Sequence, residues 1–364
     1  MKAENRPRAK PHLKNVYRID PDAKSRKGYM RLDMNEGVPG LPRGFVKAAM
    51  SKIDAEYLAT YPEYATLRKK IGRHNSLNPN NIYLANGSDG AIKNIFDAYI
   101  SKGDKVLLTD PTFAMYPVYC SIFDARPLYV EYEDDMSFPT EAFIKNISKS
   151  IKLAVVVNPN NPTGSAISRK DLIKIIEKCA SVNALIIVDE AYFYFYQSSV
   201  IDLVKKYKNL IVLRTFSKLC GMAAARVGYV AASPEIVDNL QKVKPTYDVN
   251  GLAAFLAEEL LDRPGLIKGL IRSAGRGREY LLGKLNKDGI EHKAGCANFI
   301  LIKCDGRVAE IMKRLADEKH ILVGGGFKNK FLKDCIRVTI GSIDIMKIFW
   351  NGFNNIWKKR KQLK

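Results

Sequence analysis

Short runs of β-branched and other apolar residues alternate with longer helical patterns through the middle of the chain. These runs are "KVLLTD" (105–110), "LAVVVN" (153–158), "ALIIVDE" (184–190), "LIVLRTF" (210–216) and "GYVAAS" (228–233). Continuous apolar strands that alternate with helices are typical of a mostly parallel sheet covered on both faces. The pattern therefore predicts an α/β fold with a mostly parallel central sheet.

The pattern changes after "KPTYDVNGLAAF". A long charged helical region covers about 251–290, and the strands "NFILIK" (298–303) and "IRVTIG" (336–341) flank the helix "RVAEIMKRLADEKH". Such a mixture suits a smaller α+β domain, and 364 residues are enough for a large domain with a companion. We expect an N-terminal arm at 1–34 that joins the small domain, a large domain at 35–250 and a small domain at 251–364.

Composition and charge restrict the class of protein. Hydrophobic residues make up 46% of the chain, which supports a sizeable core and argues against a fibrous or disordered protein. The 59 basic and 38 acidic residues leave a net charge of +21. The lysines are scattered over predicted helix faces, the dense basic clusters lie at the termini, and no nucleic-acid-binding signature accompanies them. We expect a solvated surface that attracts anionic ligands, and no nucleic-acid partner.

The cysteines and apolar stretches indicate the compartment. The six cysteines include no C-x-x-C pair and no metal-ligand spacing, so we expect reduced thiols and no metal site. No apolar run follows the N-terminal charges, and no apolar stretch reaches about 18 residues. We therefore expect a cytoplasmic protein without a membrane partner.

Polar residues follow four of the predicted strands. They are "TDP" at 109, "NPNNPTG" at 158, "DEAY" at 189 and "TFSK" at 215. In doubly wound sheets, ligands bind beyond the carboxyl ends of the strands. These segments, distant in sequence, should line one cleft.

A strand-to-helix turn in "NIYLANGSDGAIKNIFDAYI" (81–100) offers an anion seat. Its glycines permit close approach, and the first turn of the following helix presents backbone N–H groups and the positive end of the helix dipole. An ordinary capped turn is the alternative for this segment alone.

Two charged residues suggest chemistry, although each also has an ordinary structural explanation. Asp189 ends a buried strand, where a carboxylate needs a cationic partner or carries a cost of several kcal/mol, unless it caps a helix. Lys218 lies among small and apolar residues near Arg226, which disfavours its ammonium form and makes the amine available for Schiff-base formation. A surface lysine and a routine ion-pair arginine remain the alternatives at these positions.

The motifs also occur in a specific order. A phosphate turn, an aromatic loop, an asparagine loop, a strand-end aspartate and Ser217-Lys218 follow one another, with Arg226 eight positions after the lysine. With "NPNNPTG", "DEAY" and "RTFSK", the sequence resembles the fold type I pyridoxal-phosphate enzymes of aminotransferase class I/II. The resemblance is strongest to the histidinol-phosphate aminotransferase group and runs from "LDMNEG" (32) to "RVTIGS" (337).

The resemblance implies a role for each matching residue around the cofactor ring. Lys218 forms the Schiff base with pyridoxal 5'-phosphate and moves the proton between the substrate α-carbon and C4' of the cofactor. Asp189 pairs with the protonated pyridine nitrogen, which keeps the ring an electron sink. Asn161 and Tyr192 hold the phenolic oxygen, and Phe113 stacks on the ring.

The same resemblance supplies the phosphate contacts, which are Gly87, Ser88, Asp89, Thr215, Ser217 and Arg226. Tyr61 in "TYPEY" matches a tyrosine that reaches the phosphate of the neighbouring subunit's cofactor, so a homodimer is implied. Arg337 and Asn35 are assigned to the substrate, and Arg337 matches the arginine that binds an α-carboxylate with both arms of its guanidinium.

The implied activity is transfer of an amino group from an amino acid donor such as glutamate to a small oxo compound, phosphorylated or not. A decarboxylase acting on amino acids or phosphoamino acids is the alternative, because the same scaffold supports both reactions.

Three departures from the group concern the site. Phe113 replaces the usual tyrosine, and Gly90 replaces a common acidic residue. In "HILVGGGF" (320–327), Gly324 stands where the group normally has an arginine that binds the substrate's distal phosphate. We therefore expect histidinol phosphate to be a poor substrate, with Lys328 and Lys330 available to attract a smaller anionic compound.

Overall fold

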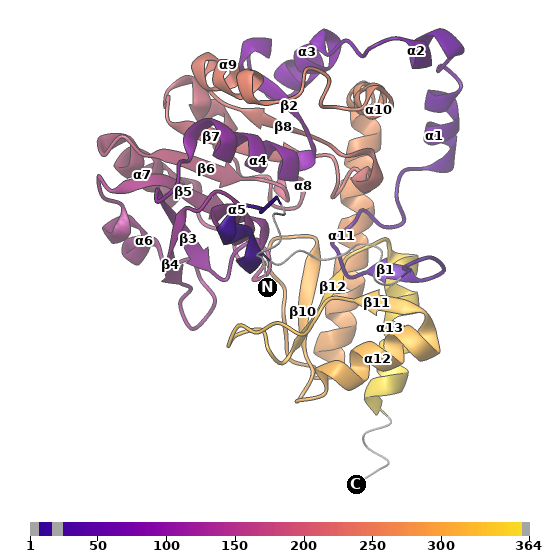
Figure 1. Ribbon diagram of the computed structural model, residues 1–364. Coiled ribbons are helices and arrows are strands. Elements are labelled where there is room, and N and C mark those ends of the chain that lie inside the picture. Colours follow the sequence, from indigo (N-terminus) through magenta and orange to yellow (C-terminus); the bar gives the residue numbers. More distant parts are fainter. Residues whose placement is uncertain (1–6, 17–24, 359–364) are drawn as a thin grey trace, which may run out of the picture.

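A seven-stranded sheet forms the centre of the computed structural model, which describes residues 7–16 and 25–358 (Figure 1). Its strand order is β2-β8-β7-β6-β5-β3-β4. The strands are β2 (Ile82–Asn86), β3 (Lys105–Asp110), β4 (Arg126–Glu131), β5 (Ile151–Val157), β6 (Leu185–Asp189), β7 (Leu210–Thr215) and β8 (Val227–Ala231). Only β8 runs antiparallel to its neighbours, and the pairs among β7, β6, β5, β3 and β4 are parallel. The predicted mostly parallel α/β sheet is confirmed.

Helices cover both faces of this sheet, because its side chains alternate between the two faces and are apolar on each. In β6, Ile186 and Val188 join one hydrophobic cluster, whereas Ile187 joins the other. The first cluster packs under α3 (Ala65–His74), α6 (Thr140–Asn146), α7 (Arg169–Ser181) and α10 (Gly251–Leu261). The second packs under α4 (Gly87–Tyr99), α5 (Met115–Ile122) and α9 (Pro234–Val243).

A third hydrophobic cluster lies between two small sheets and the C-terminal helices. One sheet has the order β12-β10-β9, and the other pairs β1 with β11. The strands are β1 (Met30–Leu32), β9 (His292–Lys293), β10 (Phe299–Lys303), β11 (Ile321–Val323) and β12 (Cys335–Thr339), and the helices are α12 (Val308–Lys319) and α13 (Ile343–Lys358). The strand β1 therefore joins the N-terminal part of the chain to the C-terminal part.

The predicted helical region at 251–290 consists of two helices. It divides before α11 (Pro264–Lys287), because a proline fixes φ and has no N–H to continue α10. Ile267, near the start of α11, packs in the first cluster, whereas Leu285, near its end, packs in the third. The long helix α11 thus runs from one core to the other (Figure 1). The domain division at residue 250 stays a prediction.

Shorter helices complete the described chain. They are α1 (Arg43–Met50), α2 (Ala55–Ala59), α8 (Phe193–Tyr196) and the 3₁₀ helices η1 (Pro11–Asn15), η2 (Pro79–Asn81), η3 (Ile201–Lys205) and η4 (Ala223–Ala225). The basic cluster from 359 onward and parts of the predicted N-terminal arm, 1–6 and 17–24, lie outside the described residues.

None of the helices in 7–16 and 25–358 is both long and apolar enough to cross a membrane. The same residues contain no cluster of three His, Cys, Asp or Glu side chains suited to a metal ion.

Candidate active site

The N-terminus of α4 forms a cradle beside Arg226. Gly87 has a φ of 72°, and a Cβ atom there would lie 2.5 Å from Nη2 of Arg226, so glycine lets the guanidinium approach the turn. Nη1 of Arg226 lies 3.5 Å from Oγ of Ser217 and donates to the carbonyl of Ala223 across 3.2 Å. Within the described residues, Arg226 forms no ion pair with a carboxylate. A cation and a helix N-terminus together make an anion site.

Other predicted phosphate ligands lie around this cradle. The hydroxyl of Thr215 donates to Oγ of Ser217 across 3.0 Å, and both side chains are buried at the end of β7. A Cβ atom at Gly228 would lie 2.8 Å from the backbone nitrogen of Ser88, so β8 passes close to the turn. Oδ1 of Asp89 accepts a hydrogen bond from Tyr119 across 3.0 Å.

Asp189 is a buried carboxylate, 2% exposed, at the end of β6. Tyr116 donates to its Oδ2 across 2.8 Å, and the backbone N–H of Ala191 donates to its Oδ1 across 3.0 Å. Burial raises the pKa of Asp189 to about 6, although these two hydrogen bonds and the charge of Lys218 lower it. No salt bridge to Asp189 occurs among the described residues. The arrangement suits a cationic ligand group.

Lys218 lies just after β7 and near Tyr192. Its Nζ donates to the carbonyl of Met34 across 3.3 Å and lies 5.7 Å from the centre of the Tyr192 ring. A Cβ atom at Gly37 would lie 2.4 Å from the carbonyl oxygen of Lys218. Glycine at position 37 therefore lets the segment after β1 pass directly over the backbone of Lys218.

Asn35 connects Tyr192 to the small sheet. Its Nδ2 donates to the Tyr192 hydroxyl across 2.9 Å, and its backbone N–H donates to Oγ1 of Thr339 in β12 across 3.1 Å. The carbonyl of Asn35 accepts from Nδ2 of Asn298 across 3.0 Å. Asn35 thus holds the Tyr192 hydroxyl in place, and its predicted role toward the substrate stays a prediction.

Arg337 in β12 meets the loop after β5. Its Nη1 donates to Oδ1 of Asn161 across 2.5 Å, and its Nη2 donates to the carbonyl of Asp33 across 2.8 Å. Its Nε is buried and has no hydrogen-bond partner within the described chain. Burial lowers the pKa of Arg337, whereas Tyr192 and Asp33 raise it. A buried unpaired donor on a guanidinium favours an anionic ligand here.

Gly324 pairs with Arg337 through the backbone. The N–H of each residue donates to the carbonyl of the other, across 2.9 and 2.8 Å. A Cβ atom at position 324 would lie 3.2 Å from the carbonyl oxygen of Asp33 and 3.3 Å from Nε of Arg337. A side chain at this position would therefore require Arg337 or the Asp33 carbonyl to shift by a few tenths of an ångström. Of the two lysines predicted to attract an anion, Lys330 forms an exposed ion pair with Glu131 at 2.9 Å.

Phe113 and Tyr61 contact different parts of the molecule. The Phe113 ring packs edge-on against Tyr116, with ring centres 6.2 Å apart. Tyr61 is 74% exposed and stacks on Tyr247, with ring centres 4.2 Å apart. Within the described chain, Tyr61 forms no hydrogen bond, ion pair or ring contact with the other predicted cofactor residues.

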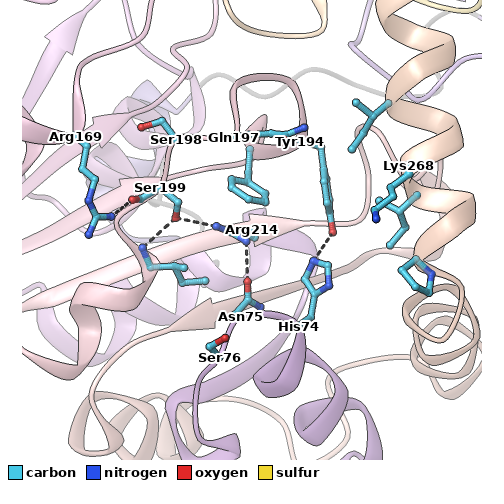
Figure 2. A pocket seen from close by; sticks show the side chains of 15 residues that line it. His74, Asn75, Ser76, Arg169, Tyr194, Gln197, Ser198, Ser199, Arg214 and Lys268 are labelled. Atoms are coloured by element: carbon cyan, nitrogen blue, oxygen red, sulfur yellow. Dashed lines mark hydrogen bonds between the residues drawn. The ribbon is translucent and has the colours of Figure 1, made fainter.

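A cavity of about 800 Å³ lies elsewhere, between α3, the segment after α8 and α11 (Figure 2). None of the predicted site residues lines it. Figure 2 shows Arg214 directed at Asn75 and Ser199, and Arg214 also forms a buried 2.8 Å ion pair with Glu190. The polar groups of Arg214 and its neighbours are hydrogen-bonded to one another. We therefore interpret these residues as stabilising the fold rather than binding a ligand. The Arg214–Glu190 pair fixes the ends of β6 and β7, where Asp189 and Thr215 lie.

Sequence reasoning missed Tyr116 and the Arg214–Glu190 pair. Tyr116 stands three positions after Phe113 in "DPTFAMY", at the spacing that puts two side chains on one side of a helical turn. Glu190 and Arg214 directly adjoin predicted site residues, yet only the paired strands show that they meet.

Comparisons with known proteins identify the relatives of this chain. A family model described as aminotransferase class I and II matches residues 29–349. Over 330 residues the chain is 37% identical to the histidinol-phosphate aminotransferase of Thermoanaerobacter pseudethanolicus, covering 90% of this chain and 92% of that protein.

Two solved structures share the fold. Histidinol-phosphate aminotransferase from Sinorhizobium meliloti, solved in complex with pyridoxal-5'-phosphate, is 20% identical with a TM-score of 0.87 and covers 97% of this chain and 98% of its own. L-threonine-O-3-phosphate decarboxylase from Porphyromonas gingivalis is 22% identical with a TM-score of 0.77 and covers 90% and 99%. These likenesses show the fold alone.

Proposed function

The chain belongs to the class I and II aminotransferase family, and we propose that Lys218 is its reactive lysine, with Asp189 and Arg226 binding opposite ends of the cofactor. It is an aminotransferase that depends on pyridoxal phosphate. The proposed residue roles rest on the surroundings of Asp189, Arg226 and Lys218.

One observation carries the assignment of roles. Asp189 is a buried carboxylate without a cationic partner, and Arg226 is a guanidinium without a carboxylate partner, within the described residues. Pyridoxal phosphate carries a phosphate and a ring nitrogen that accepts a proton, so its two ends match these two groups. Gly87 supports the fit, because a Cβ atom there would collide with Arg226.

The reaction needs both proton transfer and charge stabilisation. Bound pyridoxal phosphate supplies an electron sink for the charge left when a proton leaves the amine-bearing carbon of the substrate. Nζ of Lys218 takes that proton and returns it during the transfer. The negative charge of Asp189 would pair with the ring nitrogen of the cofactor. Tyr192, whose hydroxyl is held by Asn35, would orient the phenolic oxygen of the cofactor together with Asn161.

Arg337 indicates the substrate class. Its unpaired Nε and its contact with Asn161 support binding of an anionic group beside the cofactor. We propose an amino acid donor such as glutamate and a small oxo acceptor that carries a phosphate or carboxylate. The name of the 37% identical relative supports histidinol phosphate as a substrate, whereas Gly324 favours a smaller substrate.

The enzyme is proposed to act as a homodimer in which Tyr61 reaches the partner's site. The hydroxyls of Tyr57 and Tyr64 donate to the carbonyls of Gly251 and Val249, across 2.9 and 2.6 Å, and anchor the segment between them. That segment presents Leu58 and Tyr61 to the exterior, 65% and 74% exposed. Large exposed apolar side chains on an anchored segment are typical of an interface, and a second copy is the occupant we propose.

A cytoplasmic location is part of the same proposal. The six cysteines are all free in the structure, as expected for a reducing compartment.

Borohydride reduction tests the central assignment. The purified protein should show a visible absorbance band, and reduction followed by peptide mass spectrometry should find the cofactor on Lys218. Lys218→Ala should lose both signals, whereas Lys208→Ala, at an exposed lysine, should keep both. A cofactor adduct on another lysine would contradict the assignment.

Incubation with glutamate then tests the reaction. Conversion of the bound cofactor to its amine form supports transamination. Release of carbon dioxide without that conversion would favour the decarboxylase alternative.

A further inference from the structure

Tyr116 is a buried phenol whose hydroxyl lies at the carboxylate of Asp189. Its side chain is 0% exposed, and the O–H donates to Oδ2 of Asp189 across 2.8 Å. An ionised carboxylate has no proton to donate, so the phenol must be the donor. The other oxygen, Oδ1, accepts from the backbone N–H of Ala191. Within the described part of the chain, each carboxylate oxygen therefore has one donor.

The helix α5 holds this phenol between two predicted cofactor neighbours. The backbone N–H of Tyr116 donates to the carbonyl of Phe113 across 3.1 Å, and the two rings meet edge to face. The Tyr116 side chain therefore has little freedom to leave Asp189. A rigid donor also limits rotation of the carboxylate that it binds.

Several charged groups face Asp189 or Tyr116. Lys218, after β7, favours the ionised form of Asp189, whereas the adjacent Glu190 opposes it. Glu190 is itself paired with Arg214. Burial and the neighbouring Asp189 raise the pKa of Tyr116 well above its ordinary value, and the charge of Asp89, from α4, raises it further. Tyr116 thus stays a protonated donor across the pH range of an assay.

We propose that Tyr116 is a positioning residue of the reaction, whose hydroxyl keeps Asp189 ionised and correctly oriented to pair with the cofactor. The inference rests on the proposed role of Asp189 and adds a residue that acts through the carboxylate of Asp189. Without the Tyr116 hydroxyl, the ionised carboxylate of Asp189 would keep only the hydrogen bond from Ala191. A single donor stabilises a buried charge less than two donors do.

The test compares Tyr116→Phe with the parent enzyme across pH. The variant keeps the ring and removes only the donor, so the acid limb of the kcat profile should move up by about one to two pH units. KM for the amino donor should change little. Turnover should fall about ten-fold or more below neutral pH and largely recover in alkaline buffer. Pyridoxal phosphate affinity, titrated with cofactor-free protein, should weaken in the same acid range.

Tyr83→Phe is the matched control. Tyr83 is also 0% exposed, and its hydroxyl accepts a 2.6 Å hydrogen bond from Asn94. Among the described residues, the donors to the Asp189 carboxylate are Tyr116 and Ala191, not Tyr83. That variant should leave the acid limb in place. Equal losses at every pH in both variants, or an unshifted limb and cofactor affinity in Tyr116→Phe, would overturn the proposal.

A second replacement decides the matter if Tyr116→Phe does not fold. Site-specific 3-fluorotyrosine at position 116 preserves the shape and strengthens the O–H donor, so the acid limb should move down instead. An unshifted limb in this protein overturns the inference about Tyr116. Absence of the borohydride-stable adduct on Lys218 in the parent enzyme would instead overturn the proposed function itself.

Discussion

Nη1 of Arg337 donates a 2.5 Å hydrogen bond to Oδ1 of Asn161, and this contact joins the small sheet to the loop after β5. Arg337 also holds the carbonyl of Asp33 through Nη2, while its Nε has no partner among the described residues. The guanidinium is thus held in place by two neutral oxygens, and no carboxylate in residues 7–16 and 25–358 pairs with it. An incoming anion would supply the missing charge, and the fixed orientation would reduce the entropy lost on binding.

Replacing Arg337 with lysine should weaken binding of the anionic substrate. The charge remains, but the forked pair of donors is lost, which costs about 1.5 to 3 kcal/mol, or about ten-fold to a hundred-fold in kcat/KM. The cofactor should remain bound, so a visible absorbance band should persist. Arg314→Lys on α12, where Arg314 pairs with Glu318, is the control and should retain parent kinetics. Equal kcat/KM in both variants would remove Arg337 from the substrate site.

Asp189→Asn should stabilise the cofactor-free protein at neutral pH. The folded-state pKa of about 6 lies above the ordinary value of 3.8, so the carboxyl group stabilises the fold when protonated. This contribution is fully present below about pH 4 and is lost as the pH rises through about 6. The asparagine does not titrate, so its advantage should grow to a few kcal/mol above that range. Thermal unfolding of both apoproteins across pH measures the difference.

Asp202→Asn supplies a control of opposite sign. Arg169 lowers the pKa of Asp202, so this replacement should destabilise the protein slightly at neutral pH. In the cofactor-loaded enzyme, Asp189→Asn should instead cut turnover by orders of magnitude, at about 1.4 kcal/mol for each factor of ten. Near-normal turnover would leave Asp189 with a structural role alone.

The residues predicted correctly to lie at the sheet edge share one property. Asp189, Thr215 and Lys218 belong to local motifs at strand ends, and parallel strands bring their carboxyl ends to one edge. The Asp189–Tyr116 contact could not be predicted in this way, because it depends on how α5 packs against the sheet. The Asn161–Arg337 contact likewise requires the placement of one sheet against the other.

The missed strands have local causes. The strand β4 is an edge strand whose side chains are mostly exposed or half-buried, and it contains Pro127, so no continuous apolar run marks it. The strands β1 and β11 are three residues long and pair across nearly the whole sequence. Pairing at such separation leaves no periodic pattern to read.

Mixed dimers test whether Tyr61 completes the partner's site. Lys218→Ala and Tyr61→Ala proteins should each be impaired alone, but random mixing should restore about a quarter of the parent activity, because half of the dimers carry one intact site. If both residues served the same chain's site, mixing would restore nothing. Sedimentation should show a dimer, and an active monomer at assay concentration would contradict the interface.

The glycines at 324–326 bear on the choice of substrate. In the group that the sequence resembles, an arginine at the position of Gly324 binds the distal phosphate, and the loss of such a buried charged contact costs about 2 to 5 kcal/mol. The structure adds that a Cβ atom here would lie 3.3 Å from Nε of Arg337, so the glycine leaves this guanidinium uncrowded. Lys330, which the sequence suggests could attract an anion, is paired with Glu131.

Histidinol phosphate should therefore be a slower substrate than a smaller phosphorylated or carboxylated amine that Arg337 alone can hold. The expected deficit in kcat/KM is about thirty-fold or more, from the lower end of that energy range. A screen should compare histidinol phosphate, small phosphorylated amines and their oxo forms, and ordinary 2-oxo acids with glutamate as donor. A wide preference for histidinol phosphate would agree with the name of the 37% identical relative, and another residue would then have to do the work of the missing arginine.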